Sequence, residues 1–250
     1  MKYLLFSLFQ LLIFRTGQAQ QLFISSGKLS FEKKINIQRT IAGLDLSEEA
    51  KDNMQKYNLS TWELYFDQST SIYKQQKKAQ ENSNQFFGFS MENTNELYSD
   101  YSNSKRILKK NFFNESYLLN DTIPEIDWKI MHDVREIAGY ECRKAIGKIN
   151  DTVYVVAFYS DEILLRGGPE GFSGLPGMIL GLAIPRYNTT WFATKVEPFF
   201  STGSPPQKPK AKKTDTEKEL KKIMEIYGRF EGNKQQSIEA IRKQIYGFLL

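Results

Sequence analysis

The chain has very few of the side chains on which metal binding and nucleophilic catalysis depend. Among its 250 residues there is one histidine, His132, and one cysteine, Cys142. A zinc site needs a cluster of nitrogen or sulfur ligands, which these two residues cannot supply. His132 has no nucleophile signature near it, and no loop has the ligand spacing of an EF-hand. The sequence therefore predicts no metal site, no cofactor and no catalytic residue.

The shortage of cysteine also limits covalent links. A single thiol cannot form a disulfide within the chain. Free cysteine is among the most buried residue types, so we expect Cys142 to act as a small apolar residue on a strand. A reactive thiol, or a disulfide to another protein, is the alternative.

Glycine is concentrated in one stretch, but that stretch lacks the residues of a phosphate site. Six glycines lie between residues 167 and 181. A P-loop would end in Gly-Lys-Ser/Thr, whereas Gly177 is followed by Met178. A dinucleotide-binding turn would lead into a helix, whereas residues 178–182 are strand-like. We interpret the stretch as a long turn in which glycine permits a positive φ or a close backbone approach.

The N-terminus has the pattern of a secretory signal. Lys2 precedes an apolar run over residues 3–14, and Gly17 and Ala19 supply small residues at the cleavage-determining positions. The pattern predicts cleavage after Ala19 and export to the periplasm or the medium. No cysteine follows the cleavage site, so we expect no lipid anchor.

Strand patterns dominate residues 21–198. Leu29, Phe31 and Ile35 alternate with polar residues, which is typical of a strand with one wet face, and Lys33 interrupts the apolar side. We therefore expect this strand, over residues 27–38, to bend at Lys33 or to lie at an edge of the sheet. Further strands are predicted at residues 62–66, 87–91 and 129–134, and strands covered on both faces at residues 153–159 and 178–184.

Two other segments have different patterns. Residues 46–57 predict a short helix, and the polar residues 74–85 predict a solvated hairpin loop. The fold class that follows is mainly β, with a strongly curved antiparallel sheet or half-open β-barrel and a few covering helices. This β domain is expected to span residues 20–203.

The tail differs in composition from the rest. Residues 204–213 form a linker rich in proline and lysine, and residues 214–250 have apolar stripes that predict two amphipathic C-terminal α-helices. The linker lysines are Lys208, Lys210, Lys212 and Lys213. Their charge either keeps a spacer soluble or gives the protein a peripheral contact with anionic membrane headgroups. The charge is too local to indicate nucleic acid binding.

Residues 172–180 closely resemble the segment that names the GLPGLI family of exported bacterial proteins. The matching motif residues are Gly174, Leu175, Pro176, Gly177, Met178 and Ile179, with Met178 at the position of a leucine. Residues 127–130 and 137–145 and the pair Gly168-Pro169 resemble the accompanying blocks. Phe158 and the pair Leu164-Leu165 depart from the family pattern. The resemblance implies export by an envelope-bearing bacterium, but no established biochemical activity. The predicted order of a strand, a short helix and several antiparallel strands is similar to that of lipoprotein carriers, which is an analogy of fold alone.

Aromatic residues make up 14% of the chain. In a curved sheet they can line a concave apolar pocket. We therefore expect a non-enzymatic envelope protein that binds an apolar or lipid-like ligand or an outer-membrane partner. Phe172, Leu175, Pro176 and Met178 are the candidate rim of the ligand site. The alternatives are a hydrolase that uses carboxylates and a structural subunit that docks a partner through its C-terminal helices.

Overall fold

The structure is a computed structural model. It describes residues 23–42, 47, 49, 53–76, 96–112, 115–150, 153–199, 206–210 and 212–213. Among these residues, no helix has both the length and the apolar character needed to cross a membrane.

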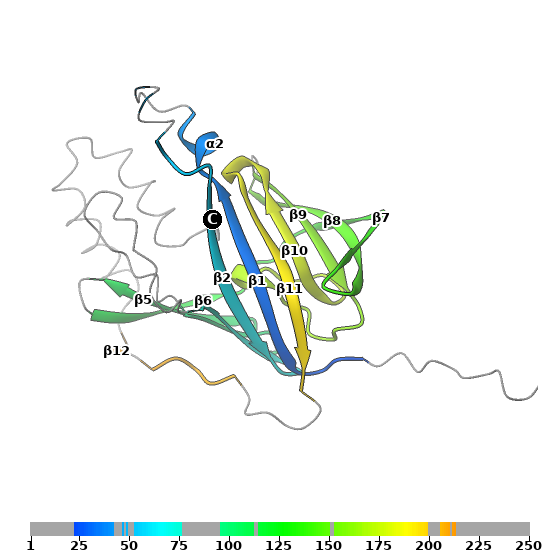
Figure 1. Cartoon of the computed structure of the whole chain (residues 1–250). Helices are drawn as coiled ribbons and strands as arrows, with labels where there is room; N and C mark the ends of the chain where they lie inside the picture. The colour runs from blue at the N-terminus through cyan, green and yellow to red at the C-terminus, as the bar shows by residue number, and fades with distance from the viewer. Residues whose placement is uncertain are drawn as a thin grey trace, which may run out of the picture.

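One large sheet contains all the described strands, as the mainly β prediction requires (Figure 1). Eleven strands pair antiparallel, and the two-residue β12 adds to one edge in parallel. The spatial order is β12-β6-β5-β4-β3-β2-β1-β11-β10-β9-β8-β7, and the sheet does not close on itself. The strands are β1 (Gly27–Asn36), β2 (Tyr57–Phe66), β3 (Thr70–Gln75), β4 (Glu96–Asp100), β5 (Lys105–Phe112), β6 (Glu115–Thr122), β7 (Trp128–Ile137), β8 (Tyr140–Asn150), β9 (Val153–Ser160), β10 (Met178–Ile184), β11 (Thr189–Pro198) and β12 (Lys212–Lys213).

Strand β1 lies in the middle of the sheet and not at its edge. It pairs with β2 along its whole length and with β11 on its other side, although the register slips by one residue after Ser30. Leu29 and Phe31 are completely buried, as their alternation predicts. The strand is two residues shorter than predicted because Asn36 caps a short helix, α2 (Ile37–Ile41), and its side-chain oxygen accepts a hydrogen bond from the Arg39 amide at 3.0 Å.

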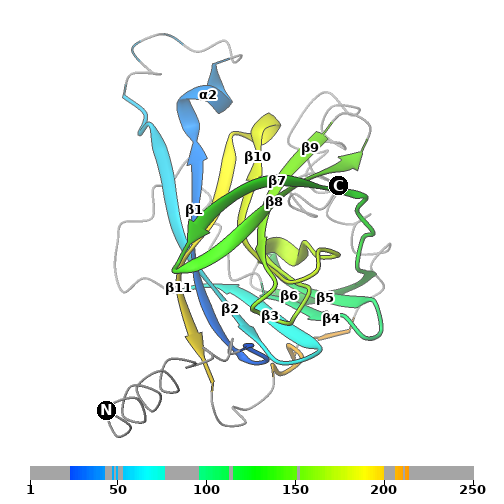
Figure 2. The same ribbon diagram turned by 90° about the vertical axis from the view of Figure 1, so that its right-hand side faces the viewer.

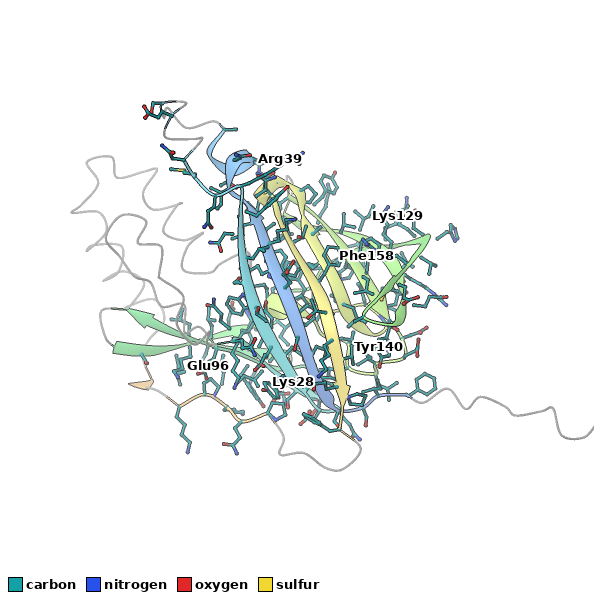
Figure 3. The ribbon with its side chains drawn as sticks, in the orientation of Figure 1. Lys28, Arg39, Glu96, Lys129, Tyr140 and Phe158 are labelled. Carbon is teal, nitrogen blue, oxygen red and sulfur yellow. The ribbon has the colours of Figure 1, made fainter. Side chains whose placement is uncertain are left out.

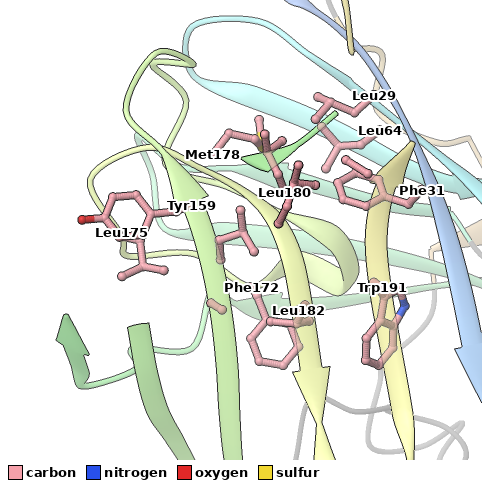
Figure 4. Close-up of a cluster of buried hydrophobic side chains, with 14 of the residues drawn as sticks. Leu29, Phe31, Leu64, Tyr159, Phe172, Leu175, Met178, Leu180, Leu182 and Trp191 are labelled. Atoms are coloured by element: carbon pink, nitrogen blue, oxygen red, sulfur yellow. The ribbon is translucent and has the colours of Figure 1, made fainter. Parts of the chain in front are cut away.

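The sheet is strongly curved, and the glycine-rich segment lies inside the curve (Figure 2). This segment contains the 3₁₀ turn η2 (Pro169–Gly171), which contacts β3, β4 and β10. A second 3₁₀ turn, η3 (Pro185–Tyr187), connects β10 to β11. The core between the segment and the strands includes Leu29, Phe31, Leu64, Phe172, Met178, Leu180 and Leu182 (Figure 4).

Strand β10 is covered on both faces, as predicted, whereas β9 is covered only in part. Ile179 of β10 meets Gly168 on one side, and on the other Gly181 lies against Ile137 of β7. In β9, burial alternates along the strand, and Tyr154 is 52% exposed. The prediction of two buried faces is therefore wrong for β9, because the side chains on its outward face are exposed or only half-buried.

Several predicted boundaries change. Tyr57, expected at the end of a helix, opens β2, because it pairs with Asn36 at the end of β1. Lys74, expected in a solvated loop, belongs to β3 and pairs with Glu63 and Glu96. Of the predicted helix at 46–57, Glu49 is helical, but residues 53–56 form a turn and irregular backbone that lead into β2, so the second half of this prediction is wrong. The remaining loop residues from 77 onwards, the strand at 87–91 and the C-terminal helices lie outside the described residues.

The described part of the Pro/Lys segment lies on the sheet. Pro209 is buried, and the Lys208 ammonium lies 5.7 Å from the centre of the Tyr98 ring. Lys212 and Lys213 then pair in parallel with Tyr117 and Leu118 of β6. These contacts place the segment across the β4–β6 part of the molecule.

Candidate functional site

The glycine-rich segment approaches its neighbours too closely for larger residues. A Cβ atom at Gly168 would lie 2.6 Å from Cβ of Ile179. At Gly177, φ is 154° and a Cβ atom would lie 2.1 Å from the carbonyl oxygen of Ser160. Both a positive φ and a close approach therefore require glycine at Gly177, as the sequence predicts for this turn.

The motif residues mostly face the core. Leu175, Met178 and Ile179 are at most 1% exposed, and Gly177 is buried. Gly174 and Pro176 are exposed at the surface. Of the candidate ligand rim, Phe172, Leu175 and Met178 are core residues (Figure 4), so Pro176 alone is accessible there.

A charged centre lies where the glycine-rich segment meets β1. Glu170 adopts a left-handed backbone conformation, with φ 55° and ψ 17°, which is uncommon for a residue with a side chain. Its Oε1 accepts hydrogen bonds from Lys33 Nζ at 2.8 Å and from Trp191 Nε1 at 3.2 Å. The Lys33 and Glu170 side chains are only 12% and 16% exposed. Lys33 therefore continues the inward-facing side of β1 as one half of an ion pair, and the predicted bend or edge is wrong.

Aromatic rings enclose this charged centre. The Lys33 ammonium lies 5.3 Å from the centre of the Trp62 ring and 5.0 Å from that of Trp191. Tyr73 stacks on Trp62, with ring centres 4.9 Å apart and planes 9° apart. Burial, and then the nearby Glu170 carboxylate, raise the pKa of Tyr73 well above its ordinary value. The phenol therefore stays neutral, and the centre holds one cation and one anion.

A second feature, the acidic groove, lies at the β7–β9 side of the sheet. One hollow of about 350 Å³ is lined by Glu141, Arg143, Tyr159, Asp161 and Glu162. A hollow of about 510 Å³ shares Glu141 and Glu162 with it and is also lined by Val134, Arg135, Glu136 and Gly139. Phe158 and Tyr140 mark this side of the sheet in Figure 3, well away from Glu96 of β4.

The groove borders the glycine-rich turn, and one of its lining cations lies against two aromatic rings. A Cβ atom at Gly177 would lie 2.8 Å from Cα of Asp161, which places the motif beside the groove. The Arg135 guanidinium lies 5.2 Å and 5.1 Å from the ring centres of Phe158 and Phe192. In the part of the chain that the structure describes, no three His, Cys, Asp or Glu side chains converge as metal ligands. The carboxylates that line the groove are hydrogen-bond acceptors of negative charge, which attract cationic groups.

Sequence reasoning identified Lys33 as an anomaly but missed Glu170 and the groove carboxylates. An isolated lysine on the apolar side of a strand was the available signal for a buried ion pair. Glu170, between Pro169 and Gly171, had no local signal of its own. Glu141 and Glu162 come together only through the pairing of β8 with β9.

The two residues singled out for their rarity lie in different environments. His132 is exposed on β7. Cys142 is completely buried, and its thiol donates a hydrogen bond to the Tyr140 carbonyl at 3.4 Å. Burial raises the pKa of Cys142 from 9.0 to about 12. Among the alternatives stated for Cys142, these observations favour a buried, unreactive thiol.

We expect Cys142 to resist Ellman's reagent in the folded protein at about pH 8 and to react stoichiometrically in urea, because only the thiolate is nucleophilic. The raised pKa also makes the free energy of unfolding depend on pH. The stabilising contribution of the protonated thiol is fully present below pH 9.0 and decreases as the pH rises toward about 12. Labelling at native pH that is as fast as in urea would contradict the buried thiol.

Comparisons with known proteins support the fold and leave the activity open. Residues 147–181 match a family described as "Protein of unknown function (Porph_ging)". These residues run from β8 into β10 and contain the glycine-rich segment that resembles the GLPGLI motif. No curated protein sequence matches the chain.

Two solved structures share the β-rich fold. The structure of PNGF-II in the C2 space group aligns with a TM-score of 0.51 and 14% identity, over 87% of this chain and 33% of that chain. PNGF-II in the P21 space group aligns with a TM-score of 0.50 and 16% identity, over 78% of this chain and 32% of that chain. The chain thus spans about a third of the length of PNGF-II. The Pseudomonas aeruginosa MucA/MucB complex aligns with a TM-score of only 0.36 and 10% identity, over 76% of this chain and 56% of that chain.

Proposed function

We propose that this chain is a non-enzymatic binding protein of the cell envelope whose ligand is an extended polypeptide segment with basic side chains. The acidic groove carries the proposal. In its first hollow, the carboxylates of Glu141, Asp161 and Glu162 outnumber the guanidinium of Arg143. The second hollow continues past Glu141 and Glu162, which suits a ligand longer than a single side chain.

The groove changes the expected class of ligand but keeps the binding role. A lipid-like ligand would need an apolar hollow. On the concave side of the sheet, the protein's own Phe172 and Leu175 belong to the core. Both hollows of the acidic groove are lined mainly by charged side chains, which favours a polar ligand.

The two largely buried carboxylates are engaged in ion pairs and do not form the carboxylate pair of a hydrolase. A glycosidase-like hydrolase uses two carboxyl groups on either side of the bond that it cleaves. Glu63 and Glu170 are largely buried, but each is in an ion pair, with Lys28 at 2.7 Å and with Lys33 at 2.8 Å. Docking of a partner through the C-terminal helices falls on residues 214–250, outside the described residues, and stays a prediction.

The test is the affinity for a fluorescently labelled hexalysine peptide, measured by anisotropy at low ionic strength. We expect the double substitution Glu141→Gln and Glu162→Gln to weaken binding by roughly three- to tenfold, because each exposed charge pair contributes modestly. Binding should also weaken as salt is added.

A matched control removes the same charge elsewhere. Glu32 and Glu125 are exposed and lie outside the groove, so the double substitution Glu32→Gln and Glu125→Gln should leave the affinity within about twofold. The whole chain has a net charge of +5, which opposes unspecific attraction of a polycation. Equal losses in the two double variants, or no binding by the unmodified protein, would refute the proposed ligand.

A further inference from the structure

The charged centre has the composition of a binding site for an organic ammonium ion. Proteins that recognise such ions surround the cation with aromatic ring faces and often add a carboxylate. Here Trp62 and Trp191 present rings 5.3 Å and 5.0 Å from an ammonium nitrogen, and the Glu170 carboxylate contacts it at 2.8 Å. The cation in this cage is the side chain of Lys33.

The parts of the cage come from three elements other than the strand that supplies the cation. Trp62 lies on β2, Trp191 on β11 and Glu170 on η2. Their positions are also fixed by contacts that do not involve Lys33. Trp62 donates a hydrogen bond to Ser60 Oγ at 3.0 Å and stacks on Tyr73, and Trp191 donates to Glu170. The cage is therefore held in shape by its own contacts.

Stability of the core alone does not explain a buried ion pair at this position. Replacing a buried ion pair by apolar residues of similar volume is often neutral or stabilising. Glu170 also adopts a left-handed backbone conformation, which is unfavourable for a residue other than glycine. These costs are explained if the carboxylate and both rings form one recognition unit for a cation.

We propose that Trp62, Trp191 and Glu170 form an ammonium-binding cage and that Lys33 is its intramolecular ligand. The bound lysine links the glycine-rich segment to the central strand β1, although Lys33 and Glu170 are 137 residues apart in the sequence. The chemical class that the cage takes is a primary alkylammonium ion. An external ion of this class should bind when the lysine side chain is truncated.

The test uses the Lys33→Ala variant of the full chain with propylammonium chloride, which replaces the carbons and the ammonium that the substitution removes. We expect the substitution to lower the Tm by roughly 5 °C or more. Propylammonium should then restore about half of that loss, and the gain should rise with the logarithm of its concentration above the dissociation constant, because it binds only the folded protein. The unmodified protein should show no such gain, because Lys33 already fills its cage.

The controls separate recognition of the cation from general effects of the additive. Sodium chloride and 1-propanol at equal concentration should not restore the lost Tm. Lys34→Ala is the matched variant, because Lys34 is the next residue on β1 and lies 3.9 Å from the centre of the single ring of Tyr57. It should show no rescue, and Lys33→Ala combined with Glu170→Gln should lose it.

If Lys33→Ala is unfolded in water, the same titration is followed as the gain of folded signal by circular dichroism. The proposal then requires propylammonium to drive folding and propanol not to do so. Rescue that is absent, that sodium chloride or 1-propanol reproduces, or that is equal in the Lys34→Ala variant would overturn it.

Discussion

Replacing Gly177 by alanine should lower the free energy of unfolding by about 4 kcal/mol. Two costs combine at this position. The backbone has a φ of 154°, which residues with a side chain rarely adopt, and the new Cβ would lie 2.1 Å from the Ser160 carbonyl oxygen. Relief would require moving the end of β9 away from the turn. The measurement is urea unfolding followed by circular dichroism, with attention to the midpoint and the slope.

The chain provides a matched control for this substitution. Gly139, in the turn between β7 and β8, also has a positive φ, of 85°, but a Cβ atom there would meet nothing within 4 Å. Gly139→Ala should therefore cost only about 1 kcal/mol, from backbone conformation alone. Similar losses of stability in the two variants would show that the close approach at Gly177 has no effect.

The second large effect is expected from Glu170→Gln, which should cost about 2–3 kcal/mol. Glutamine keeps the size and backbone preference of glutamate, so the substitution changes mainly the charge. It leaves the Lys33 ammonium, which is 12% exposed, without its carboxylate. Tryptophan fluorescence should report the change as well, because Trp62 and Trp191 both flank the ammonium.

An exposed ion pair gives the comparison for Glu170. Glu197 accepts a hydrogen bond from Lys195 at 2.8 Å, but their side chains are 39% and 65% exposed. Glu197→Gln should change the free energy of unfolding by less than about 1 kcal/mol. A Glu170→Gln variant as stable as this control would show that solvent, and not the ion pair, stabilises Lys33.

The strands could be predicted from local sequence because their signal is local. Leu29 and Phe31 alternate with polar residues, and the same holds for Trp62 and Leu64. Burial of one face of a strand imposes this period on the residues themselves. The glycine turn was predictable for a similar reason, because a positive φ selects the residue type at that position.

The charged centre and the groove could not be predicted in this way. Lys33 is separated from Glu170 by 137 residues, and no local pattern links them. Their contact depends on β1 lying beside β11 and on the glycine-rich segment entering the concave side of the sheet. Glu141 and Glu162 likewise meet only through the register of β8 and β9. The long-range pairing of strands decides both features.

The position of β1 has a consequence for how the protein folds. This strand pairs with β11, so Gly27 lies opposite Pro198. Because a chain is synthesised from its N-terminus, the β1–β11 pair cannot form until almost all of the sheet has been synthesised. Contacts so distant in sequence slow folding, because a long loop must close before they form. We therefore expect the newly made chain to stay incompletely folded for longer than a domain built from local hairpins. During this time one edge of β1 lacks its partner β11.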